Sequence, residues 1–130
     1  MNTTTFKINW DFVSRLFIGA LFIFAGVDKL RTFEATSGYM DSVLGTGAMT
    51  PVVLGLTIFI EVVISALYIW GKWRRDMLVY VLIGFTALAT ILFHNNFANP
   101  LNVIMSLKNL AIIGGLVATL HAVHKRRDLK

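Results

Sequence analysis

The stretch from Thr86 to Gly115 decides the fold of this chain, and it reads TALATILFHNNFANPLNVIMSLKNLAIIGG. Two apolar segments meet here at a polar elbow, and His94, Lys108 and Asn109 stand in or beside the apolar sequence. An ionisable side chain in such a setting is costly unless it has a partner or a function. The acid expected to serve as that partner is Glu61, which stands alone in the middle of another apolar segment.

The composition places the whole chain in a lipid bilayer. Of its 130 residues 56 % are hydrophobic and only 15 % are charged, and the mean hydropathy is +0.71. A soluble domain of this length exposes too much of its surface to hide so large an apolar fraction. The net charge of +5 comes from cations at the ends of the apolar segments, so we interpret it as a topology signal and expect no nucleic-acid partner. The chain has no cysteine, which excludes disulfide exchange and thiolate ligation.

Hydropathy predicts an all-α membrane protein with four transmembrane helices in one bundle, a single domain over residues 1–130. A helix needs about 20 residues to cross the hydrocarbon. The expected spans are residues 11–30, 51–70, 76–97 and 101–123. A cleaved signal peptide is the alternative interpretation of the first span. We reject it because no small-x-small cleavage site follows and three further spans would be left with unbalanced ends.

The connector between the first two spans is expected to hold a short helix on the membrane surface, because its apolar residues suit one side of such a helix. These residues are Phe33, Tyr39, Met40, Val43 and Leu44.

The distribution of positive charge predicts the orientation of the bundle. Four spans place both termini and the second loop on one side of the membrane. That side holds nine cations, namely Lys7, Arg15, Lys72, Arg74, Arg75, Lys125, Arg126, Arg127 and Lys130. The other side has only Lys29 and Arg31, apart from Lys108 inside the fourth span. Because the cytoplasmic loops of membrane proteins carry an excess of lysine and arginine, both termini are predicted to be cytoplasmic. Arg15 and Lys29, near opposite ends of the first span, are expected to extend to the lipid headgroups.

Helical spacing gathers the small and polar residues of each span into a stripe, and these stripes are expected to form the bundle interior. The first span contributes Arg15, Gly19, Phe22, Gly26 and Lys29 in a three-four alternation. The other three stripes are Thr57, Glu61 and Ser65; Thr86, Thr90 and His94; and Asn102, Ser106 and Asn109.

The depth of each ionisable group follows from the helical rise. Glu61 lies about 15 Å from the outer start of its span, near the midplane, and Lys108 lies roughly 10 Å deep. His94 and Lys29 lie nearer the outer surface. These four groups are expected to form a polar ladder, with Glu61 at its floor and in contact with Lys108 either directly or through one intervening group. The ladder is either a ligand or proton site or a structural ion pair that locks the helices.

Two other chemistries are not expected. A haem needs axial ligands at one depth on facing helices, whereas His94 lies at the outer end and His121 and His124 lie at the inner end of another helix. His121 and His124 are three residues apart, but without a third ligand we expect no metal site there.

The order and spacing of four motifs resemble the DoxX family of small four-helix membrane proteins. The motifs are Arg15–Phe22 leading to Ala25–Leu30, Glu61 in the second helix, Gly84–His94, and Leu107–Ala111 with Gly114 and Gly115. The likeness runs from about Arg15 to about Leu116, and it implies a polytopic inner-membrane protein. The residues that match the motifs are Arg15, Gly26, Lys29, Glu61, His94, Lys108 and Asn109.

The resemblance implies two functions. Some members are described as subunits of thiosulfate:quinone oxidoreductase, so the first hypothesis is a redox-linked subunit. In it a quinone binds beside His94, Lys108 and Asn109, Glu61 holds a proton, and a partner protein supplies electrons. The second hypothesis is a non-catalytic assembly or scaffold protein for membrane partners. A small-solute carrier is a weaker alternative, because four spans without an obvious internal repeat do not suggest a transporter.

Overall fold

The computed structural model describes residues 7–130, and over these residues the chain is helical with no strand. The elements are α1 (Trp10–Arg31), α2 (Phe33–Leu44), the 3₁₀ turn η1 (Gly47–Met49), α3 (Thr50–Phe59), the π-helix η2 (Ile60–Ile64), α4 (Ser65–Trp70), α5 (Arg75–Phe93) and α6 (Pro100–Asp128). Four stretches are long and apolar enough to cross a membrane: Trp10–Arg31, Gly47–Trp70, Arg75–Phe93 and Pro100–Asp128. The predicted all-α fold with four spans is confirmed. The single domain over residues 1–130 stays a prediction, and its first six residues lie outside the described part.

Local capping sets the ends of the helices. The Asn99 side chain accepts a hydrogen bond from the backbone N–H of Leu101 at 2.9 Å, and Pro100 occupies the first helical position of α6. The third span ends at Phe93 rather than at residue 97 as expected, because residues 94–99 form the non-helical turn between α5 and α6. Hydropathy alone did not separate this turn from the helix before it.

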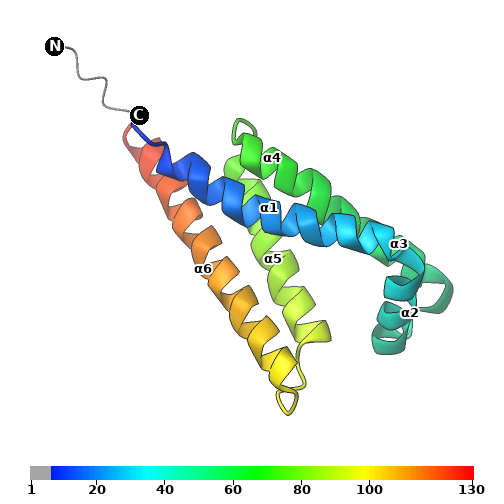
Figure 1. Ribbon diagram of the computed structural model, residues 1–130. Coiled ribbons are helices and arrows are strands. Elements are labelled where there is room, and N and C mark those ends of the chain that lie inside the picture. The colour runs from blue at the N-terminus through cyan, green and yellow to red at the C-terminus, as the bar shows by residue number, and fades with distance from the viewer. Residues whose placement is uncertain (1–6) are drawn as a thin grey trace.

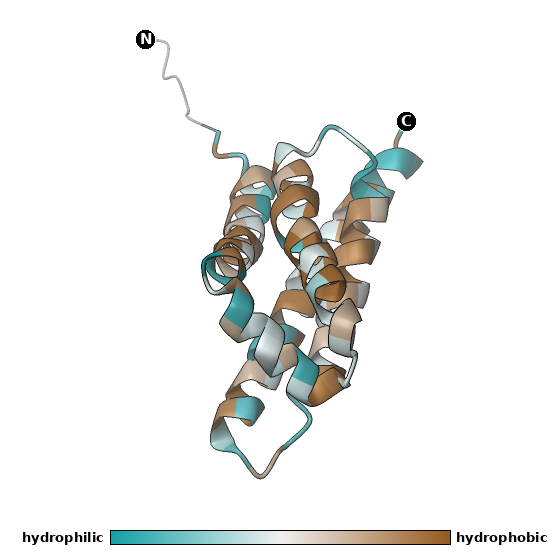
Figure 2. Cartoon of the chain, turned by 90° about the vertical axis from the view of Figure 1, so that its right-hand side faces the viewer, coloured by the Kyte–Doolittle hydropathy of each residue, from teal (hydrophilic) through white to brown (hydrophobic). Residues whose placement is uncertain are grey.

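The helices form two pairs. In the first pair α1 packs against η2 and α4, and in the second α5 packs against α6. The pairs approach each other at the end that carries the start of α1 and the end of α6, and they diverge toward the end that carries α2 (Figure 1). The core between them contains Phe22, Tyr68, Leu78, Val79, Leu82 and Leu116. Hydrophobic residues predominate along the four stretches that can cross a membrane, and Figure 2 colours the chain by this hydropathy.

The stripe predicted on the first span is confirmed at four of its five residues, since Arg15, Gly19, Phe22 and Gly26 are buried on α1, whereas Lys29 is half-buried. Gly26 has a steric reason to be glycine. A Cβ atom there would lie 2.7 Å from Val62 Cγ2 and 2.9 Å from Glu61 Cβ. The missing side chain thus lets α1 approach η2 closely, as small residues do between membrane helices.

Arg15 turns inward, so the expectation that it reaches the headgroups was wrong. Its guanidinium donates to the carbonyl oxygens of Tyr68 (3.3 Å) and Ile69 and to Asp11 Oδ2 at 3.3 Å. The last carbonyls of a helix have no partner within the helix, and Arg15 satisfies two of them at the end of α4. Asp11 also accepts a hydrogen bond from Arg75 at 2.7 Å, so this end of the bundle is held together by ion pairs.

The second span contains a π-helical segment, η2, at the depth of Glu61. π-Helical turns are rare and occur frequently at functional sites. Glu61 and Ser65 are buried as their stripe predicts, whereas Thr57 is only half-buried.

Candidate functional site: a cavity between the helix pairs

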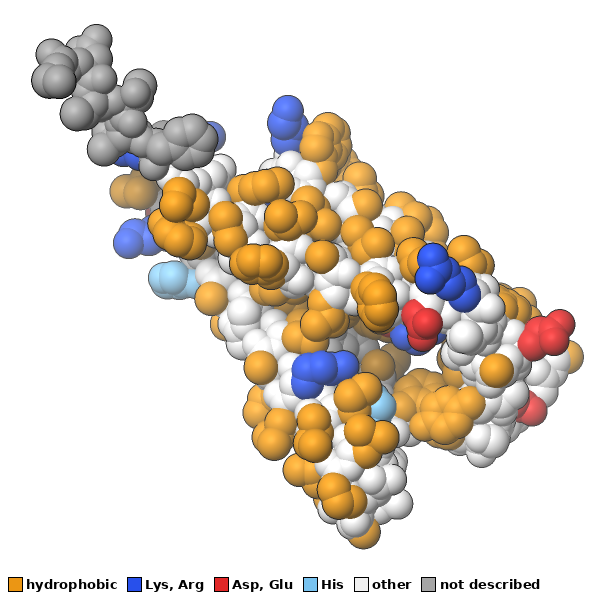
Figure 3. Space-filling model, in the orientation of Figure 1, with side chains coloured by type: hydrophobic (Ala, Val, Ile, Leu, Met, Phe, Trp, Pro, Cys, Tyr) orange, Lys and Arg blue, Asp and Glu red, His pale blue; other side chains and the backbone are white. Residues whose placement is uncertain are grey.

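A cavity of about 460 Å³ lies where the two helix pairs diverge, and it is lined by residues of α1, α2, α3, η2, α5 and α6. Figure 3 shows the hollow on this side of the molecule, below the C-terminal half of α1. Its size is within the roughly 300–1,000 Å³ of small-molecule sites. The walls are mainly apolar, with Leu21, Phe22, Leu56, Phe85, Leu92 and Ile112 among them. All five residues of the candidate site line this cavity: Lys29, Glu61, His94, Lys108 and Asn109.

An ion pair crosses from α1 to η2 at this cavity. Lys29 Nζ donates to Glu61 Oε1 at 2.9 Å, and the Glu61 side chain is only 6 % exposed. A contact between Glu61 and Lys108, direct or through one intervening group, was expected, and its direct form was wrong, because Lys29 is the ion-pair partner of Glu61. Gly26 explains the difference, because it brings α1 against Glu61 and places Lys29, one turn further along, within reach of the carboxylate.

Lys108 lies close enough to Glu61 for Coulomb attraction but forms no ion pair within 4.0 Å in the part of the chain described. Its side chain is exposed and belongs to the lining of the cavity. The site thus contains one paired cation and one that lacks a direct acidic partner.

Hydroxyl and amide groups connect α5 with α6 beside the cavity. The Asn109 amide donates to Thr90 Oγ1 at 2.8 Å, and Thr90 Oγ1 in turn donates to the carbonyl oxygen of Thr86 at 2.7 Å. At the elbow, Ser106 Oγ donates to the carbonyl oxygen of His94 at 2.9 Å. The stripes predicted on the third and fourth spans therefore contact each other, and they hold Asn109 and His94 at the cavity wall.

Two buried polar atoms of the cavity lining make no hydrogen bond within residues 7–130: Glu61 Oε2 and His94 Nδ1. Most buried polar side-chain atoms in proteins have a hydrogen-bond partner. Glu61 Oε2 can accept a hydrogen bond, and His94 Nδ1 accepts or donates one according to its tautomer. These atoms give the cavity unused hydrogen-bonding capacity beside its apolar walls.

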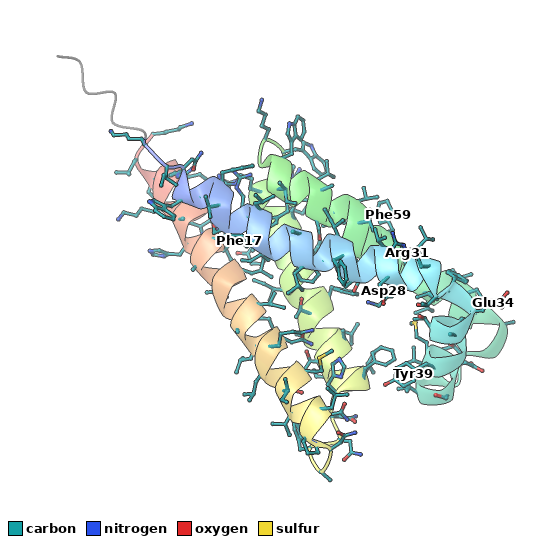
Figure 4. The ribbon with its side chains drawn as sticks, in the orientation of Figure 1. Phe17, Asp28, Arg31, Glu34, Tyr39 and Phe59 are labelled. Atoms are coloured by element: carbon teal, nitrogen blue, oxygen red, sulfur yellow. The ribbon has the colours of Figure 1, made fainter. Side chains whose placement is uncertain are left out.

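Helix α2 borders the cavity, which the sequence interpretation missed. Tyr39 points from α2 toward the end of α5 in Figure 4, and its ring centroid lies 6.0 Å from that of Phe93. Met40 is buried, and it lines the cavity together with Thr36 and Tyr39. The expected helix is present, but its apolar side packs against the bundle rather than only resting on the membrane. Asp41 holds α2 in this position by accepting hydrogen bonds from the Gly47 N–H at 2.6 Å and from Thr50 Oγ1 at 3.0 Å.

Four apolar spans around a cavity that contains both charged and apolar groups define a small polytopic membrane protein. The family model for DoxX matches residues 11–95, which cover α1 through α5 and include Lys29, Glu61 and His94. The chain belongs to the DoxX family. Lys108 and Asn109 lie on α6, outside the matched residues.

A curated relative supports the same assignment. The chain is 35 % identical over 105 residues to the inner membrane protein YqjF of Escherichia coli (strain K12), an alignment that covers 81 % of this chain and 77 % of that protein. No solved structure matches the chain. The protein is a multi-pass inner-membrane protein of the DoxX family, and its helices contact the lipid bilayer.

Proposed function

We propose that the cavity binds the ring of a lipid-soluble quinone, and that the chain acts as a redox-linked membrane subunit to which a partner protein supplies electrons. The observation that carries this proposal is the combination of apolar walls with unused polar groups in one cavity. A quinone ring has the same character, since a flat apolar body carries two carbonyl oxygens that accept hydrogen bonds.

The residues of the cavity fit the two forms of such a ligand. Lys108 and the second N–H of Asn109 are donors for a quinone oxygen, because the Asn109 amide uses only one N–H on Thr90. Glu61 Oε2 is an acceptor for the hydroxyl of a quinol and a place where a proton is held. Lys29 keeps the Glu61 carboxylate oriented through its other oxygen.

The test compares binding of a fluorescent quinone analogue to the parent protein and to His94→Ala in lipid nanodiscs. The parent is expected to show saturable binding, and His94→Ala is expected to bind roughly tenfold more weakly, because one hydrogen bond to the ring is lost. His94 is only half-buried beside the elbow, so the thermal stability of the variant should remain near that of the parent. His121→Ala, an exposed position on α6 outside the cavity lining, serves as the matched control. Absence of saturable binding to the parent would reject the quinone site and favour the scaffold hypothesis.

We further propose that both termini face the cytoplasm. Nine cations belong to the end of the bundle with the termini, and Arg15, Arg75 and Arg126 of this group surround Asp11. Reporter fusions within the turn of residues 72–75 and after Lys130 should give cytoplasmic signals, whereas a fusion at Gly45 should give a periplasmic one. A cytoplasmic signal at Gly45 would contradict this orientation.

A further inference from the structure

We infer that the cavity selects a ligand that carries one negatively charged oxygen on an apolar body, and that Lys108 binds this oxygen. The inference rests on the proposed function only in taking the apolar body of the ligand to be a quinone ring. The negative charge of the ligand is inferred separately, from the charged residues of the cavity lining. For a quinone, the inference favours the enolate of a hydroxyquinone over the neutral parent compound.

The charges of the cavity lining lead to this inference. Three lining residues carry a fixed charge, namely Lys29, Glu61 and Lys108. Lys29 and Glu61 neutralise each other across 2.9 Å, so the positive charge of Lys108 remains without a direct partner. Asp28 and Arg31 lie on the same part of α1 outside the lining, and their charges oppose each other. The cavity therefore has a net positive charge of one at the α6 wall.

The surroundings strengthen the interaction of Lys108 with an anion. Coulomb attraction is larger beside apolar walls than in water, because the local dielectric constant is lower. A hydrogen bond with both partners charged is about twice as strong as a neutral one. Asn109, the next residue on α6, is fixed to Thr90 of α5 by its 2.8 Å hydrogen bond, so the backbone that carries Lys108 is held in place.

The one acidic group of the lining attracts Lys108 but makes no ion pair with it within 4.0 Å. Glu61 comes from η2 in the other helix pair, and its charge is held by Lys29. A ligand whose charged oxygen is bound by Lys108 can still place its ring along the apolar residues of α5, including Phe85 and Leu92. The arrangement favours an amphiphile with a single acidic end.

The experiment titrates three probes into the full-length protein in nanodiscs of neutral lipid at neutral pH. The first is an alkyl-substituted hydroxynaphthoquinone, which is ionised at this pH. The second is its methyl ether, which has the same ring without the charge, and the third is decanoate, which has the charge without the ring. The parent should bind the ionised naphthoquinone at least about tenfold more tightly than its ether, the ratio expected for one charge-assisted hydrogen bond.

Three variants locate the effect. Lys108→Met should remove the preference, so that the ionised probe and the ether bind within about twofold of each other, whereas Lys108→Arg should retain the preference. Lys125→Met removes an exposed cation from the same helix outside the cavity lining and should change neither affinity. Because Lys108 is exposed and makes no ion pair within the described residues, Lys108→Met should fold normally, which its thermal stability checks.

The outcomes separate this inference from the proposed function. Equal binding of the ionised probe and its ether, or a preference that survives Lys108→Met, would overturn the inference while leaving a quinone site intact. Saturable decanoate binding that depends on Lys108, without binding of either naphthoquinone, would support the anion site and reject the quinone. Binding of none of the three probes would reject both.

Discussion

Replacing Lys29 with methionine is expected to lower the free energy of unfolding of the detergent-solubilised protein by about 3–5 kcal/mol, the typical cost of breaking a buried ion pair. The Glu61 carboxylate would lose the partner that holds it at 2.9 Å, while it stays buried between η2 and α1. Methionine retains the length and apolar character of the lysine chain, so the loss reports mainly the charge. Denaturation followed by far-ultraviolet circular dichroism measures this change.

A pair of double-mutant cycles assigns the partner of Glu61. Lys29→Met combined with Glu61→Gln should recover part of the stability lost in each single variant, because the double variant leaves no unpaired charge. Lys108→Met combined with Glu61→Gln is the matched control, and its effects should add within about 0.5 kcal/mol. A larger coupling energy in the Lys108 cycle would mean that Lys108 is the principal partner of Glu61 in the membrane protein.

The structure divides the ionisable residues of the polar ladder into a paired group and a group without a direct ion-pair partner among residues 7–130. Lys29 and Glu61 form the ion pair that joins the first two spans. Lys108 and the imidazole of His94 project toward the same cavity without a comparable partner among residues 7–130. A structural ion pair and polar groups available to a ligand can be present in the same cavity, because they come from different helix pairs.

The sequence predicted most of the fold because the bilayer restricts it strongly. A long apolar segment in lipid must be helical, so hydropathy located the four spans. Ionisable side chains avoid lipid, so their helical spacing showed which side of each span faces the interior. For that reason Lys29, Glu61, His94, Lys108 and Asn109 were predicted to share a site, and all five line one cavity.

The remaining features depend on packing between segments that are distant in sequence. Which cation pairs with Glu61 is decided by the close approach of α1 at Gly26, and no spacing within one helix reveals that approach. The π-helix η2 could not be predicted from the sequence, because its five residues include neither proline nor glycine. The sequence contained one signal for the position of α2, namely the four-residue spacing of Thr36, Met40 and Leu44. This spacing places the three residues on one side of the helix, and all three line the cavity.

Replacing Gly26 with alanine is expected to lower the free energy of unfolding by about 1–3 kcal/mol, the usual cost of overpacking a close contact. The added Cβ would lie 2.9 Å from Glu61 Cβ, an atom fixed to the backbone of η2, so α1 would have to move outward. That movement would also draw Lys29 away from Glu61 and weaken the ion pair. Gly26→Ala and Lys29→Met should therefore be non-additive, because the first change already disturbs the interaction that the second removes.

Gly55→Ala provides the matched control on the second span. An added Cβ at Gly55 meets no heavy atom within 4 Å, and the position lies in the interior of α3. Alanine there should leave stability unchanged or raise it by roughly 0.5–1 kcal/mol, because alanine is favoured over glycine within a helix. Denaturation of the two variants under identical conditions compares them directly. If Gly26→Ala were as stable as Gly55→Ala, α1 and η2 would not be in the close contact that pairs Lys29 with Glu61. Lys29 would then lack its acidic partner and could bind the charged ligand oxygen in place of Lys108.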